Sequence, residues 1–289
     1  MTTLLSARDV RALAEELDLR PTKQRGQNFV IDPNTVRMIV QAAELEPARV
    51  VAEIGPGLGS LTLGLLEAGH RVVAVEIDPV LASRLPRTVA EFHGDAEFDL
   101  VNEDALRVTD LPVTPNALVA NLPYNVAVPV LLHFLHTFGS IEQVLVMVQA
   151  EVADRLSAAP DSRIYGVPSV KAQWYGQVSR AATIGKNVFW PAPNIDSGLV
   201  RIVRRETPLG SEELRAQVFA LVDAAFAQRR KMLRSALKDW AGGAAAAEEI
   251  LVRADVDPQA RGETLDVFDF MRIAQAARDR AAAENGGPA

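Results

Sequence analysis

Residues 49–78 have the sequence RVVAEIGPGLGSLTLGLLEAGHRVVAVEID. The segment begins with an apolar run rich in β-formers, from Arg49 to Ile54, that stops at a glycine. Leucines at helical spacing follow as far as Gly69, and Arg71 to Ile77 has the composition of a second strand. This order predicts one βαβ unit, whose two strands are parallel neighbours.

Strand and helix patterns continue to alternate after this unit. Further strands are predicted at 98–101, 117–121 and 143–148, and helices at 128–138 and 150–156. Such alternation favours an α/β fold, with a mostly parallel, doubly wound sheet covered by helices on both faces.

The pattern changes at about residue 205, beyond which only helices are predicted. They cover residues 212–227, 229–240, 246–254 and 265–283. We therefore predict a Rossmann-like domain over 1–205, which includes a helical and basic N-terminal extension over 1–32. A small all-helical domain is predicted over 206–289.

Composition excludes several classes of protein. Of the 289 residues, 48% are hydrophobic and 23% charged, as in an ordinary globular protein and unlike a disordered chain. Cysteine is absent, which excludes disulfide scaffolds, thiolate metal sites and cysteine nucleophiles. Charged Arg8, Asp9 and Arg11 stand where a signal peptide would be apolar, and no run of about eighteen apolar residues occurs. We expect a cytoplasmic protein without a membrane segment.

The charge is unevenly distributed. The chain has 30 basic and 37 acidic side chains, a net charge of −7, which taken in bulk argues against a phosphate-rich partner. Basic residues nevertheless cluster at two places, Arg20, Lys23 and Arg25 near the N-terminus, and Arg229, Arg230, Lys231 and Arg234 within the predicted helix 229–240. Each cluster has two interpretations, a site for an RNA backbone or an ordinary solvated surface.

The glycines after the first strand indicate a ligand site. Gly55, Gly57 and Gly59 stand where strand turns into helix, so the chain can turn tightly and a ligand can lie against bare backbone. A dinucleotide fingerprint needs a sixth-position glycine, which is Ser60 here, so a nicotinamide dehydrogenase is disfavoured. Glycine at the first, third and fifth positions is instead typical of S-adenosylmethionine methyltransferases.

Two acids follow at the ends of the next strands. Glu76 can accept hydrogen bonds from both hydroxyls of a ribose, and Asp104 can accept one from the exocyclic amine of an adenine. The carboxyl ends of successive strands line the crevice in which open α/β sheets bind ligands. Each acid taken alone is also compatible with a surface position.

The tetrad Asn121-Leu122-Pro123-Tyr124 follows the fourth strand and suits chemistry on an adenine amine. That amine is a poor nucleophile, because its lone pair is delocalised into the ring. The side-chain oxygen of Asn121 and the carbonyl of Leu122 can each accept one of its N–H groups and so direct the lone pair. Pro123 stiffens the turn, and Tyr124 can stack on the base. The alternative is a plain proline turn.

Metal chemistry is not expected. His133 and His136 lie three residues apart on a predicted helix, which is compatible with metal binding, but no third ligand accompanies them.

Eight segments, in order, resemble the ribosomal RNA adenine dimethyltransferases, and within that family the enzymes of the small (16S) subunit. They are GQNFVID (26–32), EIGPGLGSLT (53–62), VEIDP (75–79), NLPYNVAVP (121–129), MVQAEVADRL (147–156), YGVPSVKAQW (165–174), FWPAPNIDSGLV (189–200) and FAQRRKMLRSAL (226–237). The resemblance implies a class I S-adenosylmethionine methyltransferase fold and dimethylation of two adjacent adenines near the 3′ end of 16S rRNA. We also expect a monomer.

The resemblance carries roles onto individual positions. It implies that Asn28 and Val30 close over the cofactor, with Val30 standing where the family usually has leucine. It matches Gly55, Gly57, Glu76, Asp104 and Asn121 with the other cofactor contacts. Phe189 is implied to stack on the target base opposite Tyr124, with a core phenylalanine as the alternative.

Two further functions remain open. The macrolide-resistance methyltransferases, which act on large-subunit RNA, share the glycine loop and the tetrad, but the C-terminal segments at 226–237 and 253–270 resemble the small-subunit enzymes more closely. A second alternative is a binding factor for ribosome assembly, with methylation as its release signal.

Overall fold

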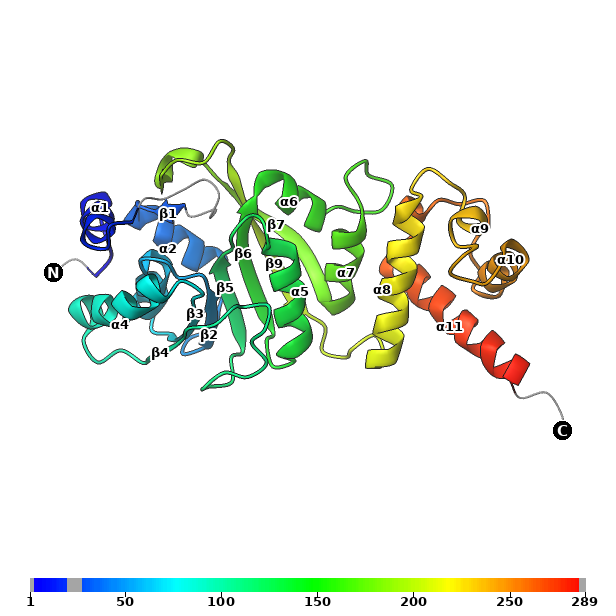
Figure 1. Ribbon diagram of the computed structural model, residues 1–289, viewed down its shortest axis with the longest axis horizontal. Coiled ribbons are helices and arrows are strands. Elements are labelled where there is room, and N and C mark those ends of the chain that lie inside the picture. The colour runs from blue at the N-terminus through cyan, green and yellow to red at the C-terminus, as the bar shows by residue number, and fades with distance from the viewer. Residues whose placement is uncertain (1–2, 20–27, 286–289) are drawn as a thin grey trace. The chain divides into compact units, whose positions relative to one another are not determined.

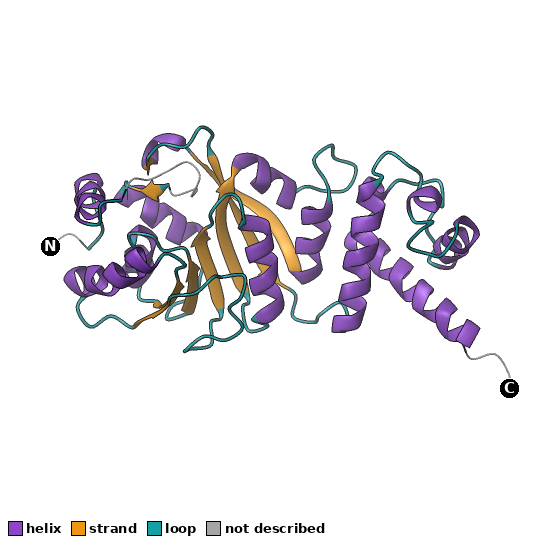
Figure 2. Cartoon of the chain, in the orientation of Figure 1, coloured by secondary structure: helices purple, strands orange, loops and turns teal. Residues whose placement is uncertain are grey.

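The structure, a computed structural model, describes residues 3–19 and 28–285. Its main sheet has seven strands in the order β4-β3-β2-β5-β6-β9-β7, flanked by helices (Figures 1 and 2). The strands are β2 (Val50–Ile54), β3 (Arg71–Val75), β4 (Phe98–Val101), β5 (Ala117–Asn121), β6 (Gln143–Gln149), β7 (Gly176–Ile184) and β9 (Ser197–Arg204). The predicted class I methyltransferase fold, a mostly parallel sheet with flanking helices, is confirmed.

Parallel pairing brings the carboxyl ends of the central strands to one edge of the sheet. Ile54 of β2 lies opposite Val75 of β3, and Asn121 of β5 lies opposite Met147 of β6. The strand interiors are buried on both faces, as their continuous apolar runs predict. The glycine loop and the tetrad therefore emerge at the same edge.

Strands β7 and β9 were not predicted from the sequence patterns. Strand β9 runs antiparallel to β6, with Ser197 opposite Gln149 and Val203 opposite Gln143. Because its direction is reversed, β9 brings its first residue, not its last, to the edge where β5 and β6 end.

Helices alternate with strands along this part of the chain. They are α2 (Pro33–Ala42), α3 (Ser60–Glu67), α4 (Pro79–His93), α5 (Ala127–Thr137) and α6 (Ala150–Leu156), preceded by α1 (Ala7–Glu16). Asp32 and Asp78 accept hydrogen bonds from backbone N–H groups at the starts of α2 and α4, each with a proline in its first turn. The side chain of Ser6 and that of Asp9 cap α1 reciprocally.

A separate two-stranded sheet joins residues far apart in the chain. Its strands are β1 (Phe29–Val30) and β8 (Phe189–Trp190), which are antiparallel, with Val30 opposite Phe189. A short 3-10 helix, η2 (Lys186–Val188), precedes β8. Phe29, Val30 and Phe189 belong to the main hydrophobic core cluster, and Trp190 packs against it.

The chain forms two compact units. The first contains the residues up to Asp154 together with Val178–Arg204, and the second contains Arg155–Gln177 together with the residues from Arg205 onward. The predicted domain boundary lies within one residue of Arg205, but it assigned 155–177 to the first domain. These residues group with the second unit because Trp174 and Tyr175, at the end of α7 (Val167–Tyr175), both meet the ring of Phe219 edge-on.

The remaining helices lie in the second unit. They are α8 (Glu212–Ala227), α9 (Leu233–Ala236), α10 (Ala244–Arg253), η3 (Gly262–Thr264) and α11 (Val267–Asn285). Helix α8 has the predicted bounds, and α10 and α11 lie within two residues of theirs.

The predicted helix over 229–240 is wrong. Residues 228–231 form a turn, and α9 has only four residues. The backbone N–H groups of Leu233 and Arg234 donate to the carbonyls of Ala260 (2.8 Å) and Pro258 (3.1 Å), rather than to the preceding helical turn. The four cations at 229–234 therefore do not share one helix face.

Candidate functional site

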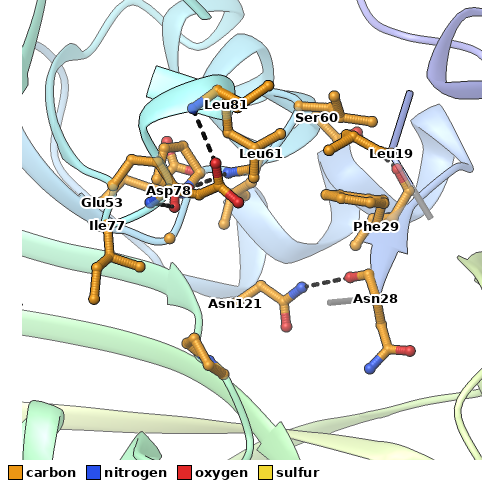
Figure 3. Close-up of a pocket in the computed structure, with 18 of the residues that line it drawn as sticks. Leu19, Asn28, Phe29, Glu53, Ser60, Leu61, Ile77, Asp78, Leu81 and Asn121 are labelled. Atoms are coloured by element: carbon orange, nitrogen blue, oxygen red, sulfur yellow. Dashed lines mark hydrogen bonds between the residues drawn. The ribbon is translucent and has the colours of Figure 1, made fainter. Parts of the chain in front are cut away.

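A cavity of about 930 Å³ lies at the carboxyl edge of the sheet (Figure 3). It is lined by the β2–α3 glycine loop, by the ends of β3 and β5, and by two N-terminal segments, residues 17–19 and 28–30. Sites for small molecules commonly have volumes of about 300–1,000 Å³. The cavity is therefore large enough for a nucleoside cofactor.

The glycine loop brings bare backbone to this cavity. Gly55 and Gly57 have φ values of +66° and +59°, in the left-handed region that favours glycine. A Cβ atom on Gly57 would lie 2.8 Å from the ring of Phe29. The absence of a side chain at this position thus allows β1 to pack against the loop.

Glu76 is held at the end of β3 by the same loop. Its carboxylate accepts hydrogen bonds from the backbone N–H of Gly57 (3.1 Å) and of Asp78 (2.9 Å). Burial raises the pKa of Glu76, and these hydrogen bonds partly counteract the rise. A carboxylate has about four acceptor positions, so capacity remains for two ribose hydroxyls.

Glu53 is a cavity residue that the sequence analysis did not assign to the site. It lies at the cavity wall with only 1% of its surface exposed and accepts a hydrogen bond from the Thr62 hydroxyl at 2.6 Å. Burial raises the pKa of Glu53 to about 8, and repulsion from nearby Glu76 adds to the rise. The carboxyl group is therefore mostly protonated at pH 7. An acid inside an otherwise apolar strand is the sequence signal that points to it.

The amide of Asn121 projects into the cavity beside Asn28 (Figure 3). Its Nδ2 donates a hydrogen bond to the backbone carbonyl of Asn28 at 3.1 Å. This contact orients the amide and leaves its oxygen as an acceptor for a ligand. The backbone N–H of Leu122 donates to Met147 at 3.0 Å, which ties the start of the tetrad to β6.

Tyr124 also lines the cavity. Its hydroxyl forms a hydrogen bond with the hydroxyl of Ser197 at 2.9 Å, and burial raises the pKa of the phenol.

Asn28 and Val30 of the N-terminal segments both line the cavity, and their closing over a cofactor stays a prediction. The carbonyl of Val30 accepts a hydrogen bond from the Ser60 hydroxyl at 2.7 Å, which joins β1 to the start of α3. Sequence reasoning missed Leu17 and Leu19 just after α1, and also Ile77, whose side chain lines the cavity with the residue 65% exposed. An apolar residue directly after a strand-end acid is the only sequence signal for Ile77.

Two residues assigned to the site are not among those that line the cavity. Asp104 accepts a hydrogen bond from the backbone N–H of Leu106 at 3.0 Å, in the turn that follows β4. Phe189 is 3% exposed and belongs to the hydrophobic core. Their roles toward an adenine stay predictions, and the position of Phe189 favours the alternative of a core residue.

The cations of the two basic clusters differ in their contacts. Arg20, Lys23 and Arg25 lie outside the described residues. Arg229 pairs with Glu263 at 2.7 Å and donates to the carbonyl of Ser162, and Arg234 lies 4.0 Å from Glu248. Arg230 and Lys231 are exposed in the turn after α8 and have no ion pair within the described part of the chain.

The described residues contain no cluster of three or more side chains that could hold a metal ion. His133, one of the two histidines considered above, forms a hydrogen bond with the carbonyl of Val108 at 2.8 Å. Across residues 3–19 and 28–285, no helix combines the length and the hydropathy needed to cross a membrane.

Comparison with known proteins gives consistent matches. A family model described as ribosomal RNA adenine dimethylase matches residues 19–275. A ribosomal RNA small subunit methyltransferase A from Streptomyces coelicolor is 66% identical over 275 residues, which cover 94% of this chain and 96% of the relative. The protein of the same name from an Arthrobacter species is 62% identical over 281 residues, covering 96% and 95%.

Two solved structures resemble the fold. A dimethyladenosine transferase from Plasmodium falciparum superposes with a TM-score of 0.74 at 20% identity, covering 86% of this chain and 97% of its own. The 23S rRNA methyltransferase ErmE superposes with a TM-score of 0.65 at 24% identity, and the match covers 87% of this chain and 100% of the ErmE chain. At these identities the likeness shows the architecture alone.

Proposed function

The chain belongs to the ribosomal RNA adenine dimethylase family, and from this premise we propose that it dimethylates two adjacent adenines near the 3′ end of 16S rRNA, using S-adenosylmethionine. The observation that carries the proposal is the Asn121 amide, oriented by the carbonyl of Asn28 at the wall of a nucleoside-sized cavity. We further propose that the protein acts as a monomer in the cytoplasm, on small ribosomal subunits.

The cavity suits S-adenosylmethionine on chemical grounds. The buried carboxylate of Glu76 would receive the ribose hydroxyls, and the exposed side chain of Ile77 offers an apolar face to the adenine ring. The bare backbone at Gly55 and Gly57 lets the cofactor approach closely. When bound, the cofactor supplies an electrophilic methyl group on a sulfonium. The two adenines together need four such transfers, so the cofactor must be exchanged between them.

The tetrad would hold the amine that attacks this methyl group. The oxygen of Asn121 and the carbonyl of Leu122 accept the two N–H groups, which turns the nitrogen lone pair away from the adenine ring. Tyr124 stacks on the unstacked base and keeps the amine at the level of these acceptors. No strong base is required, because the methylated ammonium is acidic enough to lose its proton afterwards.

The relatives' names favour the small subunit over the large one. Proteins named ribosomal RNA small subunit methyltransferase A are 60% to 66% identical to this chain, whereas ErmE, named for 23S rRNA, is 24% identical. An assembly factor that uses methylation as its release signal remains compatible with the same site.

Transfer of a labelled methyl group tests the proposal. We expect label from S-adenosylmethionine to enter small-subunit particles that lack dimethyladenine, and to appear as dimethyladenosine on nucleoside analysis. Label confined to large-subunit RNA would move the protein to the resistance class, and none in either substrate would leave binding as its activity.

The variant Asn121→Ala tests the mechanism in the same assay. Since it removes one of two acceptors for the amine, we expect the rate of transfer to fall about 100-fold or more while the variant still binds particles. Asn34→Ala, an exposed asparagine on α2, is the matched control and should transfer methyl groups at the normal rate. Near-normal turnover by Asn121→Ala would refute the role assigned to this side chain.

A further inference from the structure

Ser197 has a buried side chain at the edge of the sheet where the parallel strands end and the cavity lies. It is the first residue of β9, has 0% of its surface exposed, and forms its hydrogen bond with the Tyr124 hydroxyl at 2.9 Å. The two residues are 73 positions apart, and only the antiparallel direction of β9 brings them together.

The backbone around Ser197 is firmly held. Ser197 lies opposite Gln149 in the β6–β9 pair, and the preceding residue, Asp196, accepts a hydrogen bond from the backbone N–H of Ala150 at 3.0 Å. The side chain of Asp196 also accepts one from the backbone N–H of Lys186 at 3.0 Å. The Ser197 hydroxyl is therefore presented by a fixed element rather than by a loop.

Tyr124 is held differently. It lies in the short connection between β5 and α5, where the backbone is fixed by Leu122 donating to Met147 and by the turn from Val126 to Pro123. These contacts place the Cα atom of Tyr124, but they do not set the direction or the tilt of its ring. The bond from its hydroxyl to Ser197 fixes the far end of the side chain.

We propose that Ser197 is a positioning residue for methyl transfer, which holds the ring of Tyr124 in the plane on which the target adenine stacks. The inference rests on the proposed function, because it assigns to Tyr124 the stacking role described above. Rotamers locked by a supporting hydrogen bond are the usual means of holding a site within about 0.5 Å of its productive geometry.

The position of the adenine ring affects the rate, because the acceptors of Asn121 and Leu122 can bind the amine only within hydrogen-bond distance. The stacking plane determines the height at which the adenine amine meets the acceptors on Asn121 and Leu122. A misplacement of about 1 Å can cost about 100-fold in rate, so a partial loss of ring alignment should lower the rate by about tenfold. Binding of the cofactor does not depend on this ring plane and should be unaffected.

The test is a double-mutant cycle on the two hydroxyls. Ser197→Ala and Tyr124→Phe each remove the hydrogen bond, and Tyr124→Phe keeps the aromatic ring and leaves β9 untouched. We expect each variant to lower kcat on small-subunit particles about tenfold and to leave the dissociation constant of S-adenosylmethionine unchanged. The double variant should be no slower than either single variant, because both changes remove the same interaction.

A spectroscopic measurement reports the stacking itself. Particles with 2-aminopurine in place of the target adenine should show fluorescence quenching on binding the wild-type protein, and weaker quenching with either single variant. Ser140→Ala is the matched control. It removes a serine hydroxyl that donates to the backbone carbonyl of Pro115 at 2.7 Å, and Pro115 precedes β5, at the end of that strand away from the tetrad. It should change neither kcat nor quenching.

The outcomes separate this inference from the proposed function. If wild-type protein transfers no methyl group to particles, the proposed function fails. If it does, and either single variant retains full kcat and full quenching, the role of Ser197 is refuted. Multiplicative losses in the double variant would also refute it, because they would mean that the two hydroxyls act independently.

Discussion

Gly57 contacts both the strand-end acid Glu76 and the N-terminal residue Phe29, through its backbone N–H and through the absence of a side chain respectively. Its N–H donates to Glu76, and a Cβ atom at this position would lie 2.8 Å from the ring of Phe29. Phe29 in turn follows Asn28, whose carbonyl orients the amide of Asn121. A single added methyl group would therefore disturb both the cofactor contacts and the tetrad.

A pair of glycine substitutions separates backbone strain from this steric effect. Gly57→Ala and Gly69→Ala both place alanine at a positive φ, which costs about 1–2 kcal/mol of stability. Gly69 has no heavy atom within 4 Å of an added Cβ, so Gly69→Ala should bind S-adenosylmethionine with unchanged affinity. Gly57→Ala should displace Phe29 and weaken binding about tenfold, measured by calorimetry. Equal affinities in the two variants would contradict this account.

At the scale of elements, the turn between α8 and α9 gives four neighbouring cations different surroundings. Arg229 is tied to Glu263 and to the carbonyl of Ser162 inside the second unit. Arg230 and Lys231 point to solvent from the turn. A continuous helix would have spread the four cations over about half of its circumference, whereas the turn leaves Arg230 and Lys231 exposed while Arg229 is paired.

Salt dependence of RNA binding distinguishes these cations. We propose that Arg230 and Lys231 each contact one phosphate of the RNA. Arg230→Gln and Lys231→Gln should then each reduce the magnitude of the slope of log K against log salt concentration for small-subunit RNA by about 1. Arg229→Gln should leave that slope unchanged and instead lower the stability of the protein by about 1 kcal/mol, since its ion pair is partly exposed. A slope that falls with Arg229→Gln as well would mean that all three cations contact RNA.

At the scale of the whole molecule, the buried acid Glu53 couples folding to pH. In the folded protein its carboxyl group keeps a proton up to its pKa of about 8, whereas its ordinary pKa is 4.5. Between these values the unfolded chain has released the proton and the folded chain has not. Rising pH therefore favours the unfolded state, and the stability that Glu53 contributes is full below pH 4.5 and is lost by about pH 8.

Denaturant unfolding at several pH values tests this coupling. The free energy of unfolding of Glu53→Gln should fall less steeply than that of the wild type between about pH 5 and pH 8, because the amide cannot release a proton. Some slope should remain, since burial also raises the pKa of Glu76. Glu15→Gln, an exposed acid on α1, is the control and should follow the wild type. Parallel curves for Glu53→Gln and wild type would refute the coupling.

The sequence by itself determined those features of the protein that depend on interactions between near neighbours in the chain. Strand β4, strand β5 and helix α8 have the predicted bounds, and the glycine loop and the Asn121 tetrad lie at one cavity as expected. These features can be predicted because hydrophobic periodicity and turn chemistry act between near neighbours, and because parallel strands end at one edge.

Only the tertiary structure decided what depends on distant partners. The reversed strand β9 brings Ser197 to Tyr124, and contacts with residues 258–260 interrupt the predicted helix after α8. Burial raises the pKa of Glu53, and the packing of distant elements encloses Phe189 in the core. The physical reason is common to all of these. Neighbouring residues can point to a position, as the acid within an apolar strand points to Glu53, but its burial, hydrogen-bond partners and local dielectric are set by residues distant in the chain.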